Sequence, residues 1–492
     1  MTDTLTSRAP SVPEAGPDPR RWLALVFIAI SQLMIVVDAS IVNIALPSAQ
    51  QALHITNANR QWVITAYTLA FGGLLLLGGR IADYAGRKRT FVVGLIGFAL
   101  ASAVGGLAPN AGLLFGARAL QGAFAALMAP AALSILTVTF TDARERARAF
   151  GVYGAIAGGG LAIGLVAGGL LTQYASWRWC LLVNTPIALF AALGATRVIR
   201  ESRTPGRTRY DLPGVVTSTL GLVALVYGMT KAVSDGWGSG TVIALLVAAG
   251  VLLVSFVAIE SRSRQPLLPL RVVTERNRGG SFVASLLVGT GLFGMFLFLT
   301  YYLQGTLHYS ALKTGFAYLP FSAGVIISAT LATNLLPRFG PRRLMAVGLA
   351  MAAGGLALFT QAGLHSAYVS TVLPPVLLIS LGMGMVFVAL TSTALVGVAP
   401  GDSGVASAMV NTTQQVGGSI GTALLNTIAA SATASYIRSH GAASVAAGTM
   451  HGYTLAFATS AGLLGLAVLL VLLLVRAGAA DLPAEEQAMA VA

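Results

Sequence analysis

The residue with the clearest chemical potential is Asp38, which stands inside the first long apolar stretch, within Met34-Ile-Val-Val-Asp38-Ala-Ser40. A carboxylate near the centre of a bilayer costs roughly 2.5–3.5 kcal/mol, so an ionisable group at that depth usually serves a function. It is the only acidic residue that we place deep in a predicted span. We expect Asp38 to bind and release a proton. The alternative is a structural carboxylate that accepts hydrogen bonds from nearby hydroxyls such as that of Ser40.

Arg118 is the one basic residue deep in a predicted span, and it is therefore the candidate partner of Asp38. Opposite charges attract strongly where the surroundings have a low dielectric constant. Arg118 could instead donate to backbone carbonyls and only hold its own helix in place. Gln121 lies about one helical turn further along and could line the same cavity.

A second candidate surface is a polar helix face in the region 403–430. Its members recur at helical spacing and are Asn411, Gln415, Gly418 and Thr422, with Gln414 and Asn426 beside them. This face either lines a substrate cavity or makes hydrogen bonds between helices. The full set of candidate cavity residues is Asn43, Trp62, Tyr67, Gln121, Asn411, Gln414 and Gln415.

Other chemistries have little support in the sequence. The five histidines fall in predicted outer loops and lack the spacing of metal ligands. We find no phosphate-binding loop, paired carboxylates or nucleophile triad, so we expect no metal, no cofactor and no enzyme. The predicted loops are too short for a large soluble receptor or catalytic domain. An ion gradient is then the expected energy source.

The composition predicts an all-α integral membrane protein. Of the 492 residues 56% are apolar and only 9% are charged, whereas soluble domains average about 25% charged residues. Lipid leaves helices or closed barrels as the only spanning structures, and runs of about 20 apolar residues favour helices. We predict 14 transmembrane helices, near residues 22–46, 60–79, 90–109, 113–136, 147–172, 178–199, 212–231, 239–260, 279–303, 313–336, 343–362, 369–394, 403–430 and 451–475.

The basic residues predict the orientation. With the N-terminus in the cytoplasm, most of the 30 lysines and arginines fall on the inner side, as the positive-inside rule requires. An even number of spans then places both termini in the cytoplasm. The net charge of +14 follows from this asymmetry. It does not indicate nucleic-acid binding, because the basic residues are spread over many short segments.

An internal repeat predicts two related halves. The segment Asp83-Tyr-Ala-Gly86-Arg87-Lys88-Arg89 recurs faintly around Gly340, as Pro337-Arg-Phe-Gly340-Pro-Arg-Arg343. Paired repeats with substrate handled between them are a common transporter plan. The predicted division is a disordered cytoplasmic tail, a six-helix half, an inserted helix pair, a second six-helix half and a cytoplasmic tail, at 1–21, 22–200, 201–265, 266–476 and 477–492.

Several motifs in this order resemble the major facilitator superfamily, specifically its fourteen-span drug:proton antiporters. The segment from Gly79 to Arg89 resembles the signature loop between the second and third helices. Leu114-Phe-Gly-Ala-Arg118-Ala-Leu-Gln121-Gly122 resembles the fourth-helix motif associated with proton transfer. The pattern from Asp38 to Pro47 resembles the first-span motif of the fourteen-span branch. The resemblance covers essentially the whole chain and implies the major facilitator fold, with two extra helices between the halves.

The resemblance also implies a gating latch at the signature loop. Its residues are Gly79, Asp83, Gly86, Arg87 and Lys88, with Asp142 as a partner. Asp83 would lie near the N-terminus of a facing helix, and Arg87 or Lys88 near an acid such as Asp142. The simpler interpretation is that these basic residues only set the topology.

One motif departs from the family pattern. The fifth-helix motif of exporters usually contains a Gly-Pro pair, but Leu165 occupies the proline position here. The glycines remain and would form a small-residue face for close helix packing; they are Gly160, Gly164, Gly168 and Gly169. The missing proline is expected to alter the bending of this helix.

We therefore expect a monomeric transporter in the bacterial cytoplasmic membrane. Its expected activity is proton-coupled export of hydrophobic drugs or antibiotics, neutral or with one positive charge, by alternating access. The absence of a deep acid in the second half argues against multiply charged cations. The alternatives are an exporter of a lipid or an endogenous metabolite, or a proton symporter for uptake.

Overall fold

The structure, a computed structural model, describes residues 19–140, 142–203, 211–263, 266–398 and 403–481. Most of both predicted terminal tails lies outside the described residues. Within the described residues the chain folds into helices, without strands. The main helices are α1 (Arg21–Ala52), α2 (Trp62–Ala85), α3 (Arg87–Gly106), α4 (Ala111–Thr139), α5 (Ala143–Tyr174), α6 (Trp179–Leu182), α7 (Asn184–Val198), α8 (Leu212–Asp235), α9 (Gly240–Arg262), α10 (Leu270–Thr274), α11 (Arg276–Tyr301), α12 (Ala311–Ala317), α13 (Leu319–Leu358), α14 (Leu373–Leu395), α15 (Ser403–His440) and α16 (Val445–Leu474).

Eleven helical segments of the described chain are long and apolar enough to cross a membrane. The predicted spans that they do not account for have identifiable places. The residues of α12 and α13 count as one long segment although α13 bends sharply at Gly340. In α5 the apolar segment 159–174 is shorter than a full span, and α15 carries many polar residues. The structure is therefore consistent with 14 spans, and that number stays a prediction.

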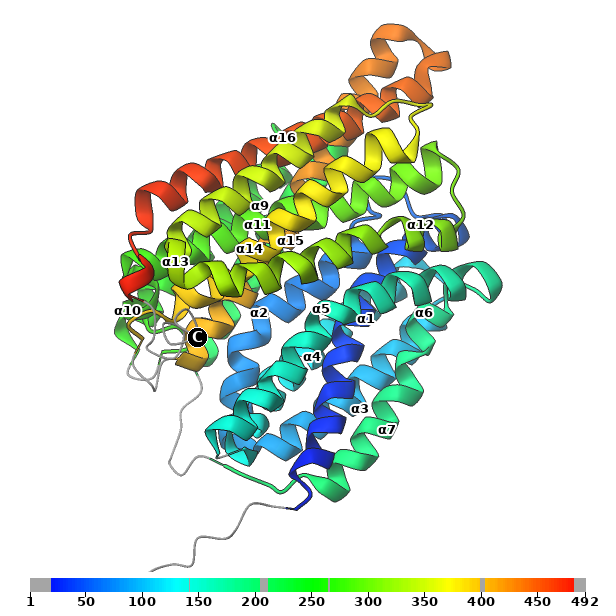
Figure 1. Cartoon of the computed structure of the whole chain (residues 1–492). Coiled ribbons are helices and arrows are strands. Elements are labelled where there is room, and N and C mark those ends of the chain that lie inside the picture. The colour runs from blue at the N-terminus through cyan, green and yellow to red at the C-terminus, as the bar shows by residue number, and fades with distance from the viewer. Residues whose placement is uncertain (1–18, 141, 204–210, 264–265, 399–402, 482–492) are drawn as a thin grey trace, which may run out of the picture.

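The helices form two bundles, which we call the N-half (α1–α7) and the C-half (α10–α16) (Figure 1). In the N-half α2 packs on α4, α3 packs on α4 and α7, and α1 packs on α5 and α7. In the C-half α13 packs on α14, while α11, α15 and α16 pack on one another. Glycines allow the closest approaches, because a Cβ on Gly78 or Gly122 would collide with the backbone of the facing helix.

The two repeat glycines occupy matching bends. Gly86 separates α2 from α3 with φ of 114°, and Gly340 divides α13 with φ of 75°. Positive φ values in this region favour glycine, which lacks the Cβ that would clash with the backbone. The faint sequence repeat thus coincides with a shared backbone conformation at corresponding turns of the two halves.

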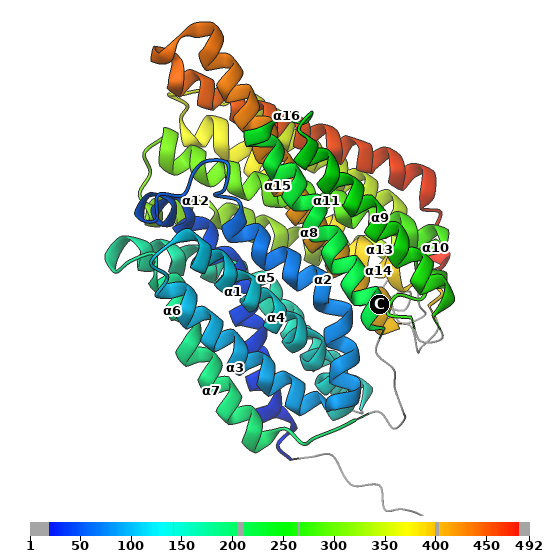
Figure 2. The same cartoon turned by 180° about the vertical axis from the view of Figure 1, so that it is seen from behind.

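The helices α8 and α9, which we call the inserted pair, lie beside α2 and α15 (Figure 2). Helix α8 contacts both halves, because Gln61 of α2's N-cap donates to Thr230 at 3.3 Å and Thr427 of α15 donates to the carbonyl of Met229 at 3.0 Å. Trp62 packs near Tyr227 of α8, with ring centroids 6.1 Å apart. The inserted pair therefore covers the seam between α2 and α15 on one flank of the molecule.

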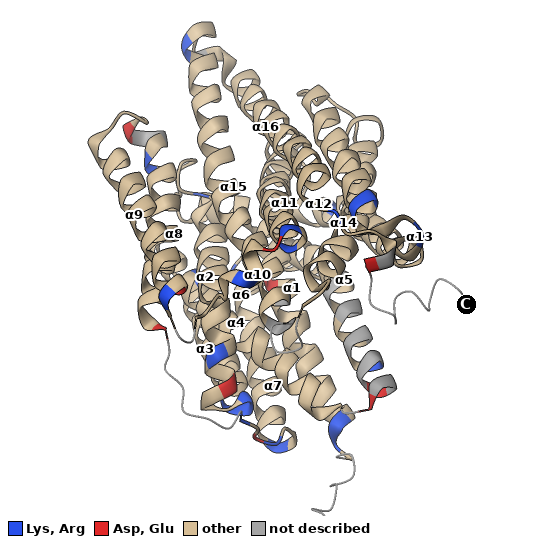
Figure 3. Cartoon of the chain, turned by 90° about the vertical axis from the view of Figure 1, so that its left-hand side faces the viewer, with Lys and Arg blue, Asp and Glu red and all other residues tan. Residues whose placement is uncertain are grey.

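The two ends of the molecule differ. We call the end where α1 begins and α2 ends the proximal end, and the opposite end the distal end. Figure 1 shows the two halves meeting near α12 at the distal end and diverging toward the proximal end. Figure 3 shows the basic residues of the N-half gathered at its proximal end, around the starts of α1 and α3 and the end of α7, while the middles of the helices are largely uncharged.

Candidate functional site: a buried ion pair in the N-half

Asp38 and Arg118 form an ion pair in the interior of the N-half. The Arg118 Nη1 atom donates to Asp38 Oδ2 at 2.6 Å. The two side chains are 0% and 1% exposed. The predicted partnership between the deep acid of α1 and the deep base of α4 is thus present as a direct, charge-assisted hydrogen bond.

Two amides complete the surroundings of the carboxylate. Gln121 Nε2 donates to Asp38 Oδ1 at 3.1 Å, and Asn184 Nδ2 donates to the same oxygen at 2.9 Å. Gln121 also donates to the hydroxyl of Ser102 at 2.7 Å and accepts from Arg118 at 3.0 Å. Both oxygens of Asp38 therefore accept hydrogen bonds, an arrangement that stabilises the ionised carboxylate.

The guanidinium group of Arg118 is held from a second side by α2. Its Nε atom donates to the carbonyl of Val63 at 2.9 Å, and its Cζ atom lies 4.4 Å from the centre of the Tyr67 ring. A cation over an aromatic face gains about 2 kcal/mol when both are desolvated. The two interpretations of Arg118 are therefore compatible, since it binds a backbone carbonyl as well as Asp38.

Four helices besides α1 position this cluster, which we call the Asp38 cluster. It consists of Asp38, Tyr67, Arg118, Gln121 and Asn184, from α1, α2, α4 and α7, with Ser102 of α3 behind Gln121. The tight approach of α2 and α4 brings the ring of Tyr67 over Arg118. The break between α6 and α7 puts Asn184 at the first residue of a helix, aimed at Asp38.

Sequence reasoning assigned no role to Asn184 or Ser102. Asn184 had a usable signal, because it is an amide close to a proline and follows a tryptophan-rich segment at a predicted helix start. Ser102 had none, since a single serine in an apolar helix is common. Two polar atoms of the cluster, the Tyr67 hydroxyl and Asn184 Oδ1, are buried without a hydrogen-bond partner in the described part of the chain. A proton or water arriving at Asp38 would find both as ready partners.

The chemistry open to this site is protonation coupled to movement. A buried ion pair is costly to break on one side only, roughly 3–5 kcal/mol, because one charge is left without compensation. Neutralising Asp38 by a proton removes the attraction that ties α1 to α4 at this point. Arg118 would keep its contacts with α2, so a protonated Asp38 would leave α1 without its charged contact to α4.

The glycines of α5 lie against α1 and, at one position, against the C-half. A Cβ on Gly160 would stand 3.0 Å from Val36, and one on Gly164 would collide with the hydroxyl of Ser40. Gly168 faces the carbonyl of Ile41, and Gly169 faces the backbone of Leu312 in α12. This helix face therefore allows α5 to pack on the same turns of α1 that flank Asp38.

Leu165 occupies the position where the family motif usually has proline. Its side chain is fully buried. A Cβ added to Gly315 would lie only 2.5 Å from the carbonyl oxygen of Leu165. The backbone of α5 thus closely approaches the C-half at Leu165. The helix α5 runs without interruption from Ala143 to Tyr174.

The signature loop binds the segment that follows α7. Asp83 accepts a hydrogen bond from Arg87 at 3.1 Å, and the ammonium of Lys88 donates to the carbonyl of Thr196 at 2.6 Å. Glu201 accepts from the backbone N–H of Lys88 at 3.1 Å. A Cβ on Gly86 would collide with the carboxylate of Glu201, and one on Gly79 would stand 3.6 Å from Pro130.

The partners of this loop differ from those expected. Asp142 caps its own helix, accepting from the backbone N–H of Glu145 at 2.9 Å, and the acid that lies against Lys88 is Glu201 of the adjoining segment. Nearby, Arg21 donates to Glu145 at 2.7 Å, and this hydrogen bond lowers the pKa of that carboxyl. The proximal contacts of α1, α3 and α5 seen here therefore stay within the N-half, and their gating role remains a hypothesis.

The polar face of α15 packs against α2 across the two halves. The hydroxyls of Thr65 and Thr422 are 2.7 Å apart, as are those of Thr68 and Ser419. Asn426 donates to Gln61 at 3.0 Å. Much of this face thus makes hydrogen bonds between helices, which was the second of the two interpretations.

The remaining candidate cavity residues do not converge on the Asp38 cluster. Gln415 packs against Gly72 of α2, Gln414 is half-buried with its backbone against α11, and Asn411 is exposed. Asn43 is half-buried and donates to the carbonyl of Ala39 at 2.9 Å. Trp62 lies against the inserted pair. Their contact with a substrate stays a prediction.

A second group closes the distal end, and sequence reasoning gave its central residue, Arg60, no role. Arg60 is buried, donates to Asn426 at 3.2 Å, and lies with its guanidinium 3.9 Å from the centre of the Tyr301 ring. The hydroxyl of Tyr301 donates to Gln50 at the end of α1. We call Gln50, Arg60, Tyr301 and Asn426 the distal latch, because these residues join the two halves.

Comparison with known proteins identifies the family. The sequence profile of the Major Facilitator Superfamily matches residues 28–422. The chain belongs to this superfamily. Its helical membrane architecture, predicted from composition and motifs, is thereby confirmed, and the chain is a multi-pass membrane transporter of this superfamily.

Several members of the superfamily are similar over most of their length. A puromycin resistance protein of Streptomyces alboniger is 52% identical over 473 residues, which cover 95% of this chain and 94% of that protein. A cephamycin export protein of Amycolatopsis lactamdurans is 39% identical, covering 83% of this chain and 85% of the other. A multidrug efflux pump of Mycolicibacterium smegmatis is 32% identical, covering 83% and 81%.

Solved structures support the same fold. A bacterial homologue of the human lysosomal transporter Spinster superposes with a TM-score of 0.69, covering 95% of this chain and 100% of that one, at 14% sequence identity. A peptide transporter superposes with a TM-score of 0.67, covering 93% and 94%, at 15% identity. At this level of identity the likenesses show the fold alone.

Proposed function

We propose that this protein exports antibiotic-like small molecules across the bacterial cytoplasmic membrane in exchange for protons. The relatives named for puromycin resistance, cephamycin export and multidrug efflux support the cargo class. The observation that carries the proton coupling is the fully buried Asp38–Arg118 pair at 2.6 Å. Burying an ionisable group at this depth costs free energy, and such groups usually serve a function.

The coupling step follows from the contacts of Asp38. In the ionised form its carboxylate accepts from Arg118, Gln121 and Asn184, which fixes α1 against α4 and α7. A proton that reaches Asp38 from the outside neutralises it, and Arg118 keeps its contacts with the Val63 carbonyl, Gln121 and the Tyr67 ring. Protonation changes the packing of α1 on α5 and α7 and favours the state open to the cytoplasm, and release of the proton into the cytoplasm is linked to the outward movement of the cargo.

The structure corresponds to a state closed at the distal end. The distal latch and the hydroxyl pairs between α2 and α15 join the halves there, and the halves diverge toward the proximal end (Figure 1). We infer that the proximal end is cytoplasmic, with both termini inside, so the cargo enters from the cytoplasm or the inner leaflet. Release requires the distal latch to open.

The energetics and the charge of the site limit the cargo. One elementary charge moved across 100 mV yields about 2.3 kcal/mol, to which a pH gradient adds. Asp38 is the one deep acid that the sequence offers, and Arg118 already balances it. A neutral or monocationic amphiphile suits this arrangement better than a multiply charged cation. The proposed division into halves at 22–200 and 266–476, the inserted pair at 201–265 and a monomeric state belong to the same hypothesis.

Efflux from everted membrane vesicles tests the proposal. Vesicles that contain the wild type should accumulate puromycin or ethidium when a proton gradient is imposed, and Asp38→Asn should lose gradient-driven accumulation while it is still expressed. Asp481→Asn, which removes an exposed proximal carboxylate, is the matched control and should transport normally. Normal gradient-driven efflux by Asp38→Asn would exclude Asp38 from the coupling step.

The alternatives give different results in the same vesicles. A symporter for uptake would move protons in the same direction as the cargo, so the sign of the pH change on cargo addition distinguishes it. An exporter of lipids or endogenous metabolites would leave puromycin and ethidium untouched while retaining a pH response to its own cargo. A panel of antibiotics tested against an expressing strain then narrows the cargo class.

A further inference from the structure

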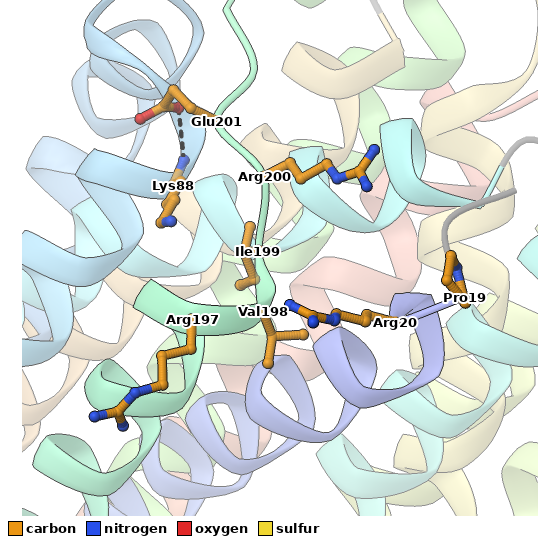
Figure 4. Close-up of a pocket in the computed structure, with 8 residues that line it drawn as sticks. All are labelled: Pro19, Arg20, Lys88, Arg197, Val198, Ile199, Arg200 and Glu201. Carbon is orange, nitrogen blue, oxygen red and sulfur yellow. Dashed lines mark hydrogen bonds between the residues drawn. The ribbon is translucent and has the colours of Figure 1, made fainter. Parts of the chain in front are cut away.

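A basic pocket lies at the proximal end of the N-half, remote from the Asp38 cluster. Its volume is about 560 Å³, within the range of about 300–1,000 Å³ that is usual for small-molecule sites. The start of α1, the start of α3 and the end of α7 form its walls (Figure 4). The lining residues are Pro19, Arg20, Lys88, Arg197, Val198, Ile199, Arg200 and Glu201.

The charge of this pocket favours an anion. Four of its lining residues are cationic and one, Glu201, is acidic. The carboxylate of Glu201 accepts from the backbone N–H groups of Lys88 at 3.1 Å, Arg89 at 3.2 Å and Ser202 at 3.0 Å. Its negative charge is thus directed at the N-terminus of α3. The lining residues therefore carry more positive than negative formal charge.

The basic side chains surround the pocket from several elements. Figure 4 shows the guanidinium of Arg20 and the side chain of Lys88 on different sides of Val198 and Ile199. Lys88 is held in place by its hydrogen bond to the carbonyl of Thr196 at 2.6 Å. A ligand between them would contact α1, α3 and α7 together.

The apolar surface below the pocket indicates what else the ligand carries. On α7, Phe190 and Leu193 are 60% and 57% exposed, and Arg197 follows them on the same helix face. On α3, Val93 is 54% exposed and stands one turn from Arg89. The exposed apolar surface of α7 therefore ends at Arg197 of the pocket, and that of α3 ends at Arg89, the neighbour of the pocket residue Lys88. A ligand that fits both features has an anionic head and apolar chains.

We propose that this pocket binds the headgroup of an anionic phospholipid, whose acyl chains lie along the exposed faces of α3 and α7. Basic pockets between helices at the cytoplasmic side of a membrane are typical sites for such headgroups. The bound lipid bridges the ends of three helices of the N-half and so stabilises their mutual packing. A general role in topology alone would require no selective binding.

Lipid binding to the purified, full-length protein tests this site. Native mass spectrometry of protein released from nanodiscs that contain equal phosphatidylglycerol and phosphatidylcholine measures which lipid stays bound. The site variant Arg20→Gln with Arg197→Gln removes two cationic groups, and its affinity for phosphatidylglycerol should fall about thirtyfold. The control variant Arg262→Gln with Arg338→Gln removes two exposed arginines of the same end elsewhere, and should retain the lipid.

Thermal unfolding gives a second readout, because a ligand that binds the folded state raises its apparent melting temperature. Phosphatidylglycerol should stabilise the wild type and the control variant more than the site variant. Glycerol 3-phosphate, which has the phosphate without acyl chains, should not replace the lipid. If the double variant does not purify as a single species, Arg197→Gln alone carries the test, since this side chain is exposed.

Three results would overturn the proposal. The site variant retains phosphatidylglycerol as well as the wild type; both double variants lose it equally; or glycerol 3-phosphate protects the protein as effectively as the lipid. The first would show that Arg20 and Arg197 do not hold the lipid, and the second that the basic residues act only through overall charge. The third would show a site for soluble anions instead. None of these results depends on whether the protein exports antibiotics.

Discussion

Replacing Arg118 by Gln is expected to destabilise the N-half strongly, because Asp38 would remain buried without its cation. The side chains are 1% and 0% exposed, so water cannot replace the missing partner. Removing one member of a buried pair costs roughly 3–5 kcal/mol. At about 2–4 °C per kcal/mol for folding units of 150–250 residues, the melting temperature should fall by on the order of 10 °C.

The double variant Asp38→Asn with Arg118→Gln separates this effect from simple loss of packing. Neutral amides of similar size leave no buried charge, and they can hydrogen-bond to Gln121 and Asn184. We expect the double variant to be more stable than Arg118→Gln alone, with a coupling of roughly 2 kcal/mol or more between the two positions. Both Arg118→Gln and the double variant should lack proton-driven transport.

The assay is thermal unfolding of the wild type, both single variants and the double variant in one detergent. Unfolding is measured by tryptophan fluorescence and by loss of the monodisperse peak in size-exclusion chromatography. Additive shifts, in which the double variant loses the sum of both single losses, would refute the reasoning. So would an Arg118→Gln protein as stable as the wild type. Either result would mean that Asp38 is compensated by groups other than Arg118 or is reached by water.

Three further predictions concern other contacts. Gly164→Val adds methyl groups where α5 meets α1, and overpacking of about 1–3 kcal/mol should lower both the melting temperature and efflux, whereas Gly164→Ala should be milder. Asn184→Leu removes one of the amide donors to the buried carboxylate, so a loss of about 1–3 kcal/mol and weaker proton-driven efflux are expected, with vesicle transport as the measurement. Arg60→Gln removes the cation that lies over the Tyr301 ring in the distal latch. The rate of backbone amide hydrogen exchange in residues 53–62 should then rise about thirtyfold. An unchanged exchange rate would contradict the role of the latch.

Much of the architecture could be predicted because membrane helices have a clear signature in the sequence. Long apolar runs, alternating basic loops and the glycines at 86 and 340 gave the helices, their order and the repeat. The Asp38–Arg118 pair was predictable for a related reason, since few charged residues occur deep in apolar segments and they require each other. Where the helices are short or polar, as around α12 and α15, the span boundaries were harder to predict.

The rest of the site depends mainly on packing between segments that are distant in the sequence. Asn184 reaches Asp38 because the chain breaks between α6 and α7, and Ser102 matters only because Gln121 lies next to it. Arg60 looked like an ordinary loop residue, although it is buried between the halves in this state. Such residues acquire their roles from neighbours that are distant in sequence.

The position of α8 makes the two sides of the transporter unequal. On one side, α8 covers the contact between α2 and α15 and is hydrogen-bonded to both halves. On the other side, α5 of the N-half meets α12 of the C-half (Figures 1 and 2). On the side that α8 covers, movement of the two halves must either carry α8 along or break its hydrogen bonds to one half. In the part of the chain that the structure describes, the opposite side has no such helix, so the two halves need not move symmetrically.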